Sequence, residues 1–138
     1  MGGDNTSWIW NTYDPALNPA NYTTALGAPN GNCPGVSALW DEMYYGIASA
    51  NTIIAKAEDV FTDEAKRKLC LAHAYFLRGY NYYRLAAQYG HFVIQNEPVN
   101  TVVRNFTRST EEECWEQVIS DLRQAYNLFE GENFTYGK

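Results

Sequence analysis

The sequence predicts an all-α protein built as an antiparallel array of long helices. Apolar residues recur at steps of three and four in three stretches, 36–60, 62–89 and 109–129. Residues typical of helix starts and ends bound these stretches, and the connections between them are short. Three such helices resemble a stack of helix pairs, so we expect no substantial sheet and regard the chain as a fragment of a larger helical domain.

Length and composition narrow the class of protein. The chain has 138 residues, of which 46% are hydrophobic, and this is enough to bury a core. Its net charge of −6 argues against binding to nucleic acid or to an anionic membrane, which both favour clustered Lys and Arg. No apolar run approaches the roughly 18 residues of a membrane helix. The first residues lack the features of a signal peptide, so if the native protein is exported, we expect its signal upstream of this chain.

Residues 1–35 are expected to be irregular, because proline, glycine and asparagine are frequent there and no period is sustained. Aromatic residues are interleaved with them, at Trp8, Trp10, Tyr13 and Tyr22. Disordered tails are poor in aromatic residues, so we expect this segment to be packed or used for binding. We treat it as a segment separate from the helical region 36–138.

The first helix, 36–60, carries one apolar stripe that includes Trp40, to which we assign a structural role. Asn51 lies at the edge of this stripe. A buried amide without a hydrogen bond costs about 1–3 kcal/mol, so we expect Asn51 to bond to a neighbouring backbone.

The second helix, 62–89, is expected to begin at a Thr62 cap and to end at Gly90. Its apolar residues cover nearly all sides, which predicts a position in the middle of a stack. Gly79 in the middle of this helix is unfavourable by about 1 kcal/mol relative to alanine, and we attribute it to the close approach of another helix. The apolar residues are Leu69, Leu71, Ala72, Tyr75, Phe76, Tyr80, Tyr82, Tyr83, Leu85 and Ala87.

Arg78 is the one charge set among the aromatic residues of the second helix. A guanidinium group is rarely buried without a partner. We expect it to pair with Asp121 of the third helix, with Asp41 as the second candidate. This pair would join helices, and contact with a ligand is the alternative role.

The third helix, 109–129, is expected to open with a capping box of Ser109 and Glu112 and to end at Gly131. The glutamates in its first turn suit the positive end of the helix dipole, and we prefer this interpretation to a metal site. Its predicted buried stripe consists of Trp115, Val118, Ile119, Leu122, Ala125 and Phe129.

Sequence signatures of catalysis, metal binding and cofactor binding are missing from this chain. There are two histidines, and neither an HExxH pattern, a GxSxG pattern nor a glycine-rich phosphate loop is present. The three cysteines have no zinc spacing, and Cys70 one turn from His73 is interpreted as a buried apolar residue beside a chance histidine. We therefore predict no enzyme, no catalytic residues, no metal and no cofactor.

Four stretches, in order, resemble the SusD/RagB-like family of the Bacteroidetes cell surface. The motifs are W-x-x-M-Y-x-x-I-x-x-A-N from Trp40 to Asn51, A-Y-F-L-R-G-Y-x-Y-Y-x-L from Ala74 to Leu85 with Tyr89-Gly90, R-S-T-E-E from Arg108 with I-x-D-L-x-x-A from Ile119, and Tyr136-Gly137-Lys138. The resemblance covers residues 36–138. In one departure, Val93-Ile94 replaces the Pro-Leu pair that usually follows the glycine.

The resemblance implies a TPR-like helical scaffold in a surface-exposed lipoprotein of the outer membrane. Such proteins bind glycans without chemistry and pass them to a TonB-dependent transporter for nutrient uptake. The lipid anchor would lie upstream of this chain, so Cys33 is not that anchor. Two other functions remain open: a helical scaffold that binds a protein or peptide, and an enzyme whose catalytic half lies elsewhere.

A glycan site is predicted in the aromatic N-terminal segment, at Trp8, Trp10, Asn11 and Tyr13. Alternate residues of an extended strand share a face, so the two indoles would lie about 7 Å apart. Flat indole rings stack on the C–H faces of sugars, and the Asn11 amide can bond to hydroxyl groups. The alternative is that both indoles pack beneath the helices as a small core.

Overall fold

The computed structural model describes residues 34–99 and 106–131, and within them it contains three helices and no strand. The helices are α1 (Pro34–Val60), α2 (Glu64–Tyr89) and α3 (Glu111–Phe129). The chain divides into two compact units, Met1–Glu42 and Met43–Lys138, and the packing described below lies within the second unit. The predicted all-α class and the three helices are confirmed.

The start of α2 lies one residue beyond the predicted cap. Asp63 is the N-cap, and its carboxylate accepts hydrogen bonds from the backbone N–H groups of Ala65 and Lys66. The prediction of Thr62 was therefore wrong. A carboxylate carries charge toward the positive end of the helix, so aspartate is favoured over the neighbouring threonine at this position.

The capping box of α3 is likewise shifted by one residue. Thr110, not Ser109, is the N-cap, and its hydroxyl accepts from the backbone N–H of Glu113 at 3.3 Å. The Glu113 carboxylate accepts from the backbone N–H of Thr110 at 2.8 Å. Ser109 instead donates its backbone N–H to the carbonyl of Phe92, which fixes the chain before the helix begins.

Both predicted terminating glycines lie where positive φ angles are required. Gly90 has φ 71° and donates its N–H to the carbonyl of Ala86, and Gly131 has φ 86°. Glycine adopts such angles without steric cost, so each ends its helix.

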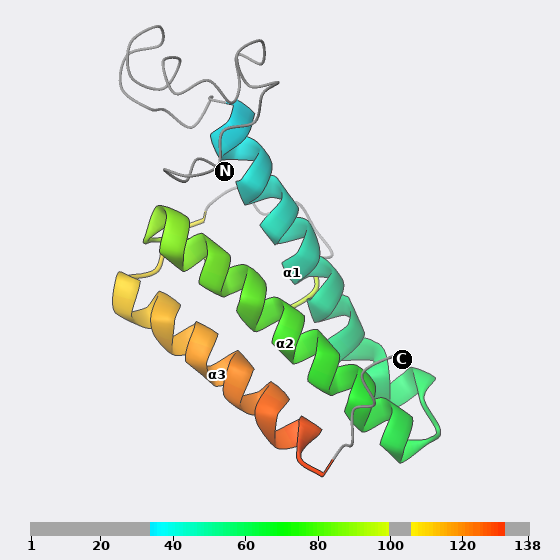
Figure 1. Ribbon diagram of the computed structural model, residues 1–138. Coiled ribbons are helices and arrows are strands. Elements are labelled where there is room, and N and C mark those ends of the chain that lie inside the picture. The colour runs from blue at the N-terminus through cyan, green and yellow to red at the C-terminus, as the bar shows by residue number, and fades with distance from the viewer. Residues whose placement is uncertain (1–33, 100–105, 132–138) are drawn as a thin grey trace, which may run out of the picture. The chain divides into compact units, whose positions relative to one another are not determined.

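Helix α2 lies between α1 and α3, and successive helices run antiparallel (Figure 1). A side chain at Gly79 would meet Cβ of Asp121 and the side chain of Leu122, each at 3.1 Å, so the predicted close approach of another helix is confirmed. A side chain at Gly46 of α1 would overlap Asn81 of α2. Glycines thus permit close packing of α2 with both neighbours.

The connector after α2, residues 91–99, returns over the helices and completes the core. Phe92 is fully buried and stacks on Tyr82, with ring centroids 5.1 Å apart. Cys114 of α3 is buried beside it, and its thiol lies 3.8 Å from the Phe92 carbonyl. The other large buried side chains include Ile47 of α1 and Leu85 of α2.

One predicted apolar face is not buried. Phe76, Tyr80 and Tyr83 of α2 are 46%, 42% and 44% exposed, and Ile119 of α3 is 52% exposed. The prediction that α2 is covered on nearly all sides was therefore wrong on this face. The opposite face is covered by α1 and the connector.

Candidate functional site

The predicted site residues fall into two groups. Trp8, Trp10, Asn11 and Tyr13 lie outside the residues that the structure describes. The predicted structural residues lie within it. Trp40 is half-buried on α1 in the first unit.

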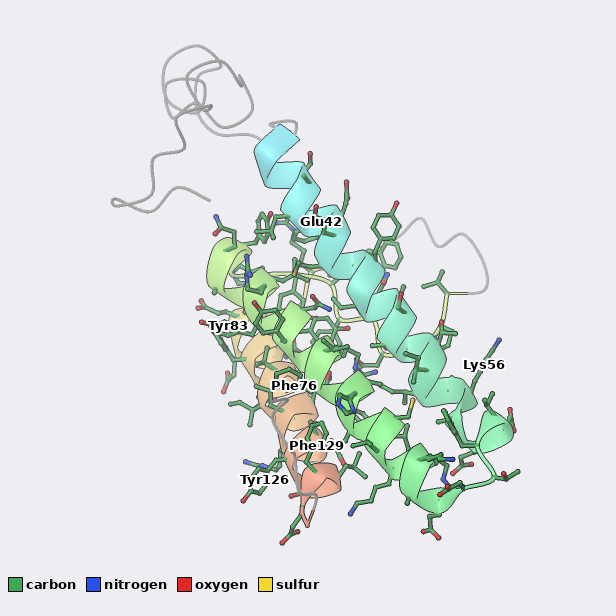
Figure 2. The ribbon with its side chains drawn as sticks, turned by 45° about the vertical axis from the view of Figure 1, so that its right-hand side comes forward. Glu42, Lys56, Phe76, Tyr83, Tyr126 and Phe129 are labelled. Atoms are coloured by element: carbon green, nitrogen blue, oxygen red, sulfur yellow. The ribbon has the colours of Figure 1, made fainter. Side chains whose placement is uncertain are left out.

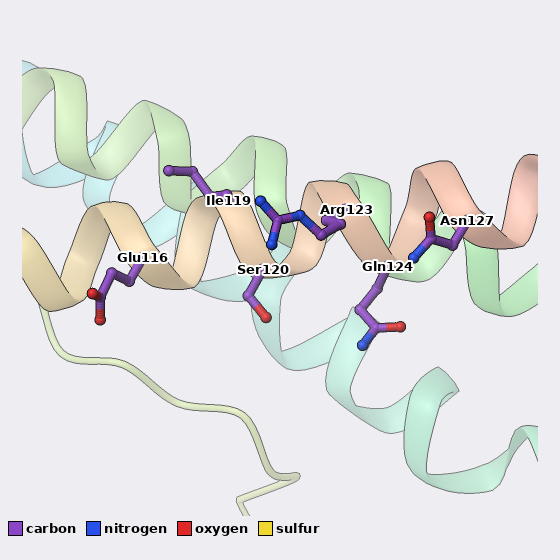
Figure 3. A pocket seen from close by; sticks show the side chains of 6 residues that line it. All are labelled: Glu116, Ile119, Ser120, Arg123, Gln124 and Asn127. Atoms are coloured by element: carbon purple, nitrogen blue, oxygen red, sulfur yellow. The ribbon is translucent and has the colours of Figure 1, made fainter.

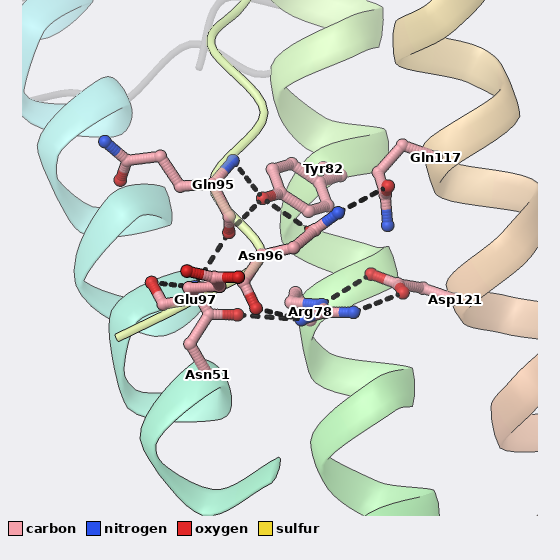
Figure 4. Close-up of polar contacts among 8 residues, drawn as sticks. All are labelled: Asn51, Arg78, Tyr82, Gln95, Asn96, Glu97, Gln117 and Asp121. Carbon is pink, nitrogen blue, oxygen red and sulfur yellow. Dashed lines mark hydrogen bonds and ion pairs between the residues drawn. The ribbon is translucent and has the colours of Figure 1, made fainter. Parts of the chain in front are cut away.

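Asn51, Arg78 and Asp121 come together from three different helices (Figure 4). The guanidinium of Arg78 forms a two-pronged ion pair with Asp121: Nε donates to Oδ2 at 2.8 Å and Nη2 to Oδ1 at 2.7 Å. Its Nη1 donates to Asn51 Oδ1 at 2.8 Å and to the carbonyl of Asn96 at 3.3 Å. The expected Arg78–Asp121 pair is thus present, and it also reaches α1 and the connector.

This cluster is buried, and its polar groups are satisfied. Arg78 and Asp121 are 5% and 1% exposed. Burial alone would lower the pKa of Arg78, but the hydrogen bonds and negative charge of Asp121 outweigh it and raise that pKa above its ordinary value. Among the described residues, every buried side-chain nitrogen and oxygen has a hydrogen-bond partner. Such a pair is costly to break, because either partner alone would be a buried unpaired charge.

Three side chains hold the backbone of the connector in place. The Tyr44 hydroxyl donates to the carbonyl of Val93 at 2.7 Å and accepts from its N–H at 2.9 Å. The Tyr82 hydroxyl likewise donates to the carbonyl of Gln95 at 2.6 Å and accepts from the N–H of Gln95 at 2.9 Å. Asn51 Nδ2 adds a bond to the carbonyl of Gln95 at 2.7 Å, which fulfils its expected link to a neighbouring backbone.

Burial changes the acidity of both tyrosines. It raises the pKa of Tyr44 to about 12, although the hydrogen bond to Val93 acts in the opposite direction. The pKa of Tyr82 is also raised, and burial is again the main cause. Both hydroxyls therefore stay protonated at neutral pH and can donate and accept at once.

The buried cluster leaves no position open to a metal ion or a ligand. Its role is structural, because its hydrogen bonds join the helices to the connector. Sequence reasoning identified Asn51, Arg78 and Asp121 and missed Tyr44 and Tyr82. The available signal was that aromatic residues on interior stripes carry hydroxyl groups, and buried hydroxyls require partners.

A second feature is the aromatic surface on the other side of α2 and α3. We call it the open face and define it as the exposed Phe76, Tyr80, Tyr83, Ile119 and Tyr126 together with the half-buried Trp115, whose ring contacts Tyr83. Ring centroids lie 6.5 Å apart between Phe76 and Tyr80, 6.5 Å between Tyr80 and Tyr83, and 6.2 Å between Tyr83 and Trp115. Figure 2 shows Tyr83, Phe76 and Tyr126 distributed along the two helices.

A shallow depression of about 390 Å³ adjoins the open face at Ile119. Its lining residues all belong to α3, and Figure 3 shows them projecting from that one helix: Glu116, Ile119, Ser120, Arg123, Gln124 and Asn127. A wall supplied by a single helix does not enclose a small ligand. We therefore do not assign a ligand to it.

Metal and membrane features were sought in the same described residues. No group of three His, Cys, Asp or Glu side chains in residues 34–99 and 106–131 is placed to hold a metal ion. None of the three described helices contains a stretch long and apolar enough to cross a membrane.

Comparison with known proteins places this geometry in context. Residues 7–135 match the sequence model of a SusD-like family described as starch-binding and associating with the outer membrane. The matched region begins at residue 7, so it includes the N-terminal aromatic segment as well as the helices.

Two relatives illustrate the match. SusD-like protein P2 of Formosa agariphila is 33% identical over 107 residues, which cover 76% of this chain and 20% of that protein. The crystal structure of a SusD-like protein from Bacteroides fragilis superposes with a TM-score of 0.66 at 19% identity, and it covers 72% of this chain and 20% of that one. The second comparison supports the fold. The chain spans about a fifth of the length of both relatives.

Proposed function

This chain belongs to the SusD-like family, and on that premise we propose that the protein of which it forms part captures glycans at the surface of the outer membrane. The bound glycan would pass to a TonB-dependent transporter for nutrient uptake, without chemical change. A lipid anchor upstream of this chain would hold the protein at the membrane. Family membership carries this proposal, since the family is described as starch-binding and associating with the outer membrane.

The ligand contacts are assigned to Trp8, Trp10, Asn11 and Tyr13. The support is chemical: two indoles, a phenol and an amide in one short segment supply stacking surfaces and hydrogen-bonding groups for sugar. The matched family region includes this segment. Within the second unit, the buried cluster joins α1, α2, α3 and the connector.

A glycan array on the full-length protein would first identify the ligand, and calorimetry would then measure its affinity. Trp8→Ala with Trp10→Ala should abolish binding and leave the melting temperature nearly unchanged. Tyr45→Ala is the matched control, because Tyr45 is an aromatic residue 76% exposed on α1. Loss of stability with retained binding would instead assign the indoles to the core.

The absence of catalysis is tested in the same experiment. Mass spectrometry of the glycans after incubation with the full-length protein should return them unchanged. A shortened or modified product would overturn the non-enzymatic assignment.

A helical scaffold that binds another polypeptide is the second candidate function. The open face favours it, because apolar side chains repeated along helix faces fit a helix better than a sugar.

A further inference from the structure

We propose that the side-chain amides of Asn96 and Gln117 form a contact site for an uncharged oligosaccharide. Asn96 belongs to the connector and Gln117 to α3, and both lie in the second unit. The site rests on the proposed function, because the oligosaccharide is the glycan that the protein would capture. It adds a position far along the sequence from the aromatic residues 8–13.

The two amides bond to each other at the surface between the connector and α3 (Figure 4). Asn96 Nδ2 donates to Gln117 Oε1 at 2.8 Å, and the Tyr82 hydroxyl lies 3.5 Å from Asn96 Oδ1. Asn96 is exposed and Gln117 is half-buried. The amide pair is therefore held in one arrangement while solvent still reaches it.

The backbone that carries Asn96 is fixed from the interior. The carbonyl groups of three successive residues, Gln95, Asn96 and Glu97, all accept hydrogen bonds from buried side chains. Arg78 Nη1 donates to the central carbonyl at 3.3 Å, and Asn51 Nδ2 donates to the other two at 2.7 and 3.3 Å.

This support suits a binding group better than a simple connection. A buried ion pair often adds no stability over apolar side chains of similar volume. The Arg78–Asp121 pair therefore gains little as a source of stability alone, but it holds the guanidinium that fixes the carbonyl of Asn96. Binding groups need such a supporting layer, because a small displacement weakens their hydrogen bonds.

The amide pair keeps hydrogen-bonding groups for a ligand. A carboxamide has two N–H donors and an oxygen that can accept two hydrogen bonds. One of the four donors is used between Asn96 and Gln117, and within the described part of the chain no protein group accepts from the others. A sugar hydroxyl donates and accepts at once, so neighbouring hydroxyls of one sugar can bond to both amides.

The charges around the pair favour an uncharged sugar. Glu97 follows Asn96 directly and is exposed, and Glu113, one helical turn before Gln117, is exposed as well. A carboxylate accepts hydrogen bonds from sugar hydroxyls, but it repels the carboxylates and sulfates of acidic polysaccharides. The ligand class is therefore a neutral oligosaccharide.

Calorimetry on the full-length protein tests the site. The probe is maltoheptaose, because the matching family is described as starch-binding. The tightest uncharged oligosaccharide of the glycan array replaces it if the wild type does not bind maltoheptaose. Asn96→Ala and Gln117→Ala should each weaken binding about three- to tenfold, which is the effect of losing one or two neutral hydrogen bonds.

Gln124→Ala is the matched control. It removes the same amide from an exposed position of α3, two helical turns beyond Gln117, and should leave the affinity unchanged. The melting temperatures of all three variants should stay close to that of the wild type, because the bond between Asn96 and Gln117 lies at the surface.

Hydrogen–deuterium exchange of the wild-type protein gives a readout that needs no substitution. The backbone N–H groups of Asn96 and Glu97 should exchange more slowly when the oligosaccharide is bound, because the sugar would shield them from water. The turn at residues 61–63, between α1 and α2, is the reference and should exchange equally with and without sugar. If a variant loses both stability and affinity, this exchange measurement decides between the two roles.

The remaining outcomes would each overturn the site. Equal affinity in the wild type and in both alanine variants would do so and leave the proposed function standing. A lower melting temperature with unchanged affinity would make the amide pair only a link between the connector and α3. Unchanged exchange at residues 96 and 97 would exclude a sugar there, and an array that finds only acidic glycans would contradict the ligand class. An array without any ligand would contradict the proposed function itself.

Discussion

The two sides of the α2–α3 pair differ in how they are completed. On the inner side, an arginine, an aspartate, an asparagine and two tyrosines bond to one another or to the connector, and within the described part of the chain every buried side-chain nitrogen and oxygen has a partner. On the open face, large side chains repeat at helical spacing, and about half of their surface is in contact with water. The inner side is specified by directional bonds, whereas the open face is specified only by its apolar pattern.

This contrast separates two sources of stability. Bonds of the inner side form within this region and fix its internal arrangement. The open face adds further stability when another element covers it, since the free energy of burial scales with the apolar area removed from water. Substitutions on the two sides should therefore change the free energy of unfolding by different amounts. On the open face, the change should also depend on whether another element covers that face.

The largest effect is expected at Arg78. Arg78→Ala leaves Asp121 buried without its partner, and we expect the free energy of unfolding to fall by about 3–5 kcal/mol in urea denaturation. Arg123→Ala on the exposed side of α3 is the control and should change it by less than about 0.5 kcal/mol. Similar losses of unfolding free energy for both variants would contradict the difference between the two sides.

The next effect is expected at Gly79. Gly79→Val would press its side chain on Asp121 and Leu122, which are already at 3.1 Å from an ideal Cβ, and should cost about 1–3 kcal/mol. Ala87→Val introduces the same side chain at an exposed position of α2 and is the control. Thermal unfolding of the two variants would measure the difference, and equal melting temperatures would contradict tight packing at Gly79.

We call the bonds of the Tyr44 and Tyr82 hydroxyls to the connector backbone the tyrosine clamp, and it should weaken in alkali, where stability is lost. The pKa of Tyr44 is about 12 when folded and about 10 when unfolded, so the folded state holds the proton more tightly. The contribution of the protonated Tyr44 hydroxyl to the free energy of unfolding is complete below about pH 10, and it is lost as the pH rises through about 12. Urea denaturation across this range should show the decline.

Removal of the hydroxyl tests the same clamp at neutral pH. Tyr44→Phe leaves the N–H and carbonyl of Val93 without their partner and should cost about 1–3 kcal/mol, and the alkaline decline should become shallower. Tyr45→Phe, at the neighbouring exposed position, should leave both properties unchanged. An identical alkaline decline in the two variants would show that Tyr44 does not contribute to it.

The smallest effect is expected at the start of α3, which belongs to neither side. Thr110→Ala removes the cap and should cost about 1 kcal/mol. Ser109→Ala should cost little, because Ser109 contributes its backbone N–H at this turn. A larger loss of unfolding free energy for Ser109→Ala than for Thr110→Ala, measured by urea denaturation, would support the capping box at Ser109 that the sequence predicted.

Sequence reasoning was most reliable where a physical requirement had few solutions. A buried arginine needs a carboxylate, and the third helix places Asp121 at the right depth for Arg78. Helix caps were displaced by one residue because Ser109 and Thr110 are both hydroxyl residues with a glutamate three positions later. The residue types alone cannot decide whether the capping box begins at Ser109 or at Thr110.

The open face shows a different limit of the same reasoning. Helical periodicity correctly grouped Phe76, Tyr80 and Tyr83 on one side of α2. Periodicity states that a face is apolar and does not state which element covers it. The proposed glycan residues, Trp8 and Trp10, lie outside the described residues and stay a prediction.

The tyrosine clamp has a consequence for how this region can vary in sequence. Tyr44 and Tyr82 bond to the backbone N–H and carbonyl of Val93 and Gln95, much as a neighbouring strand would. These four bonds do not involve the side chains of Val93 and Gln95. Substitutions along this stretch should therefore accumulate without altering its path, provided that the exchanged residue keeps an N–H group. Proline is the exception at both positions, since it would delete one of the paired donors. Positions 93 and 95 are thus places where related proteins can diverge while the helices around them stay constant.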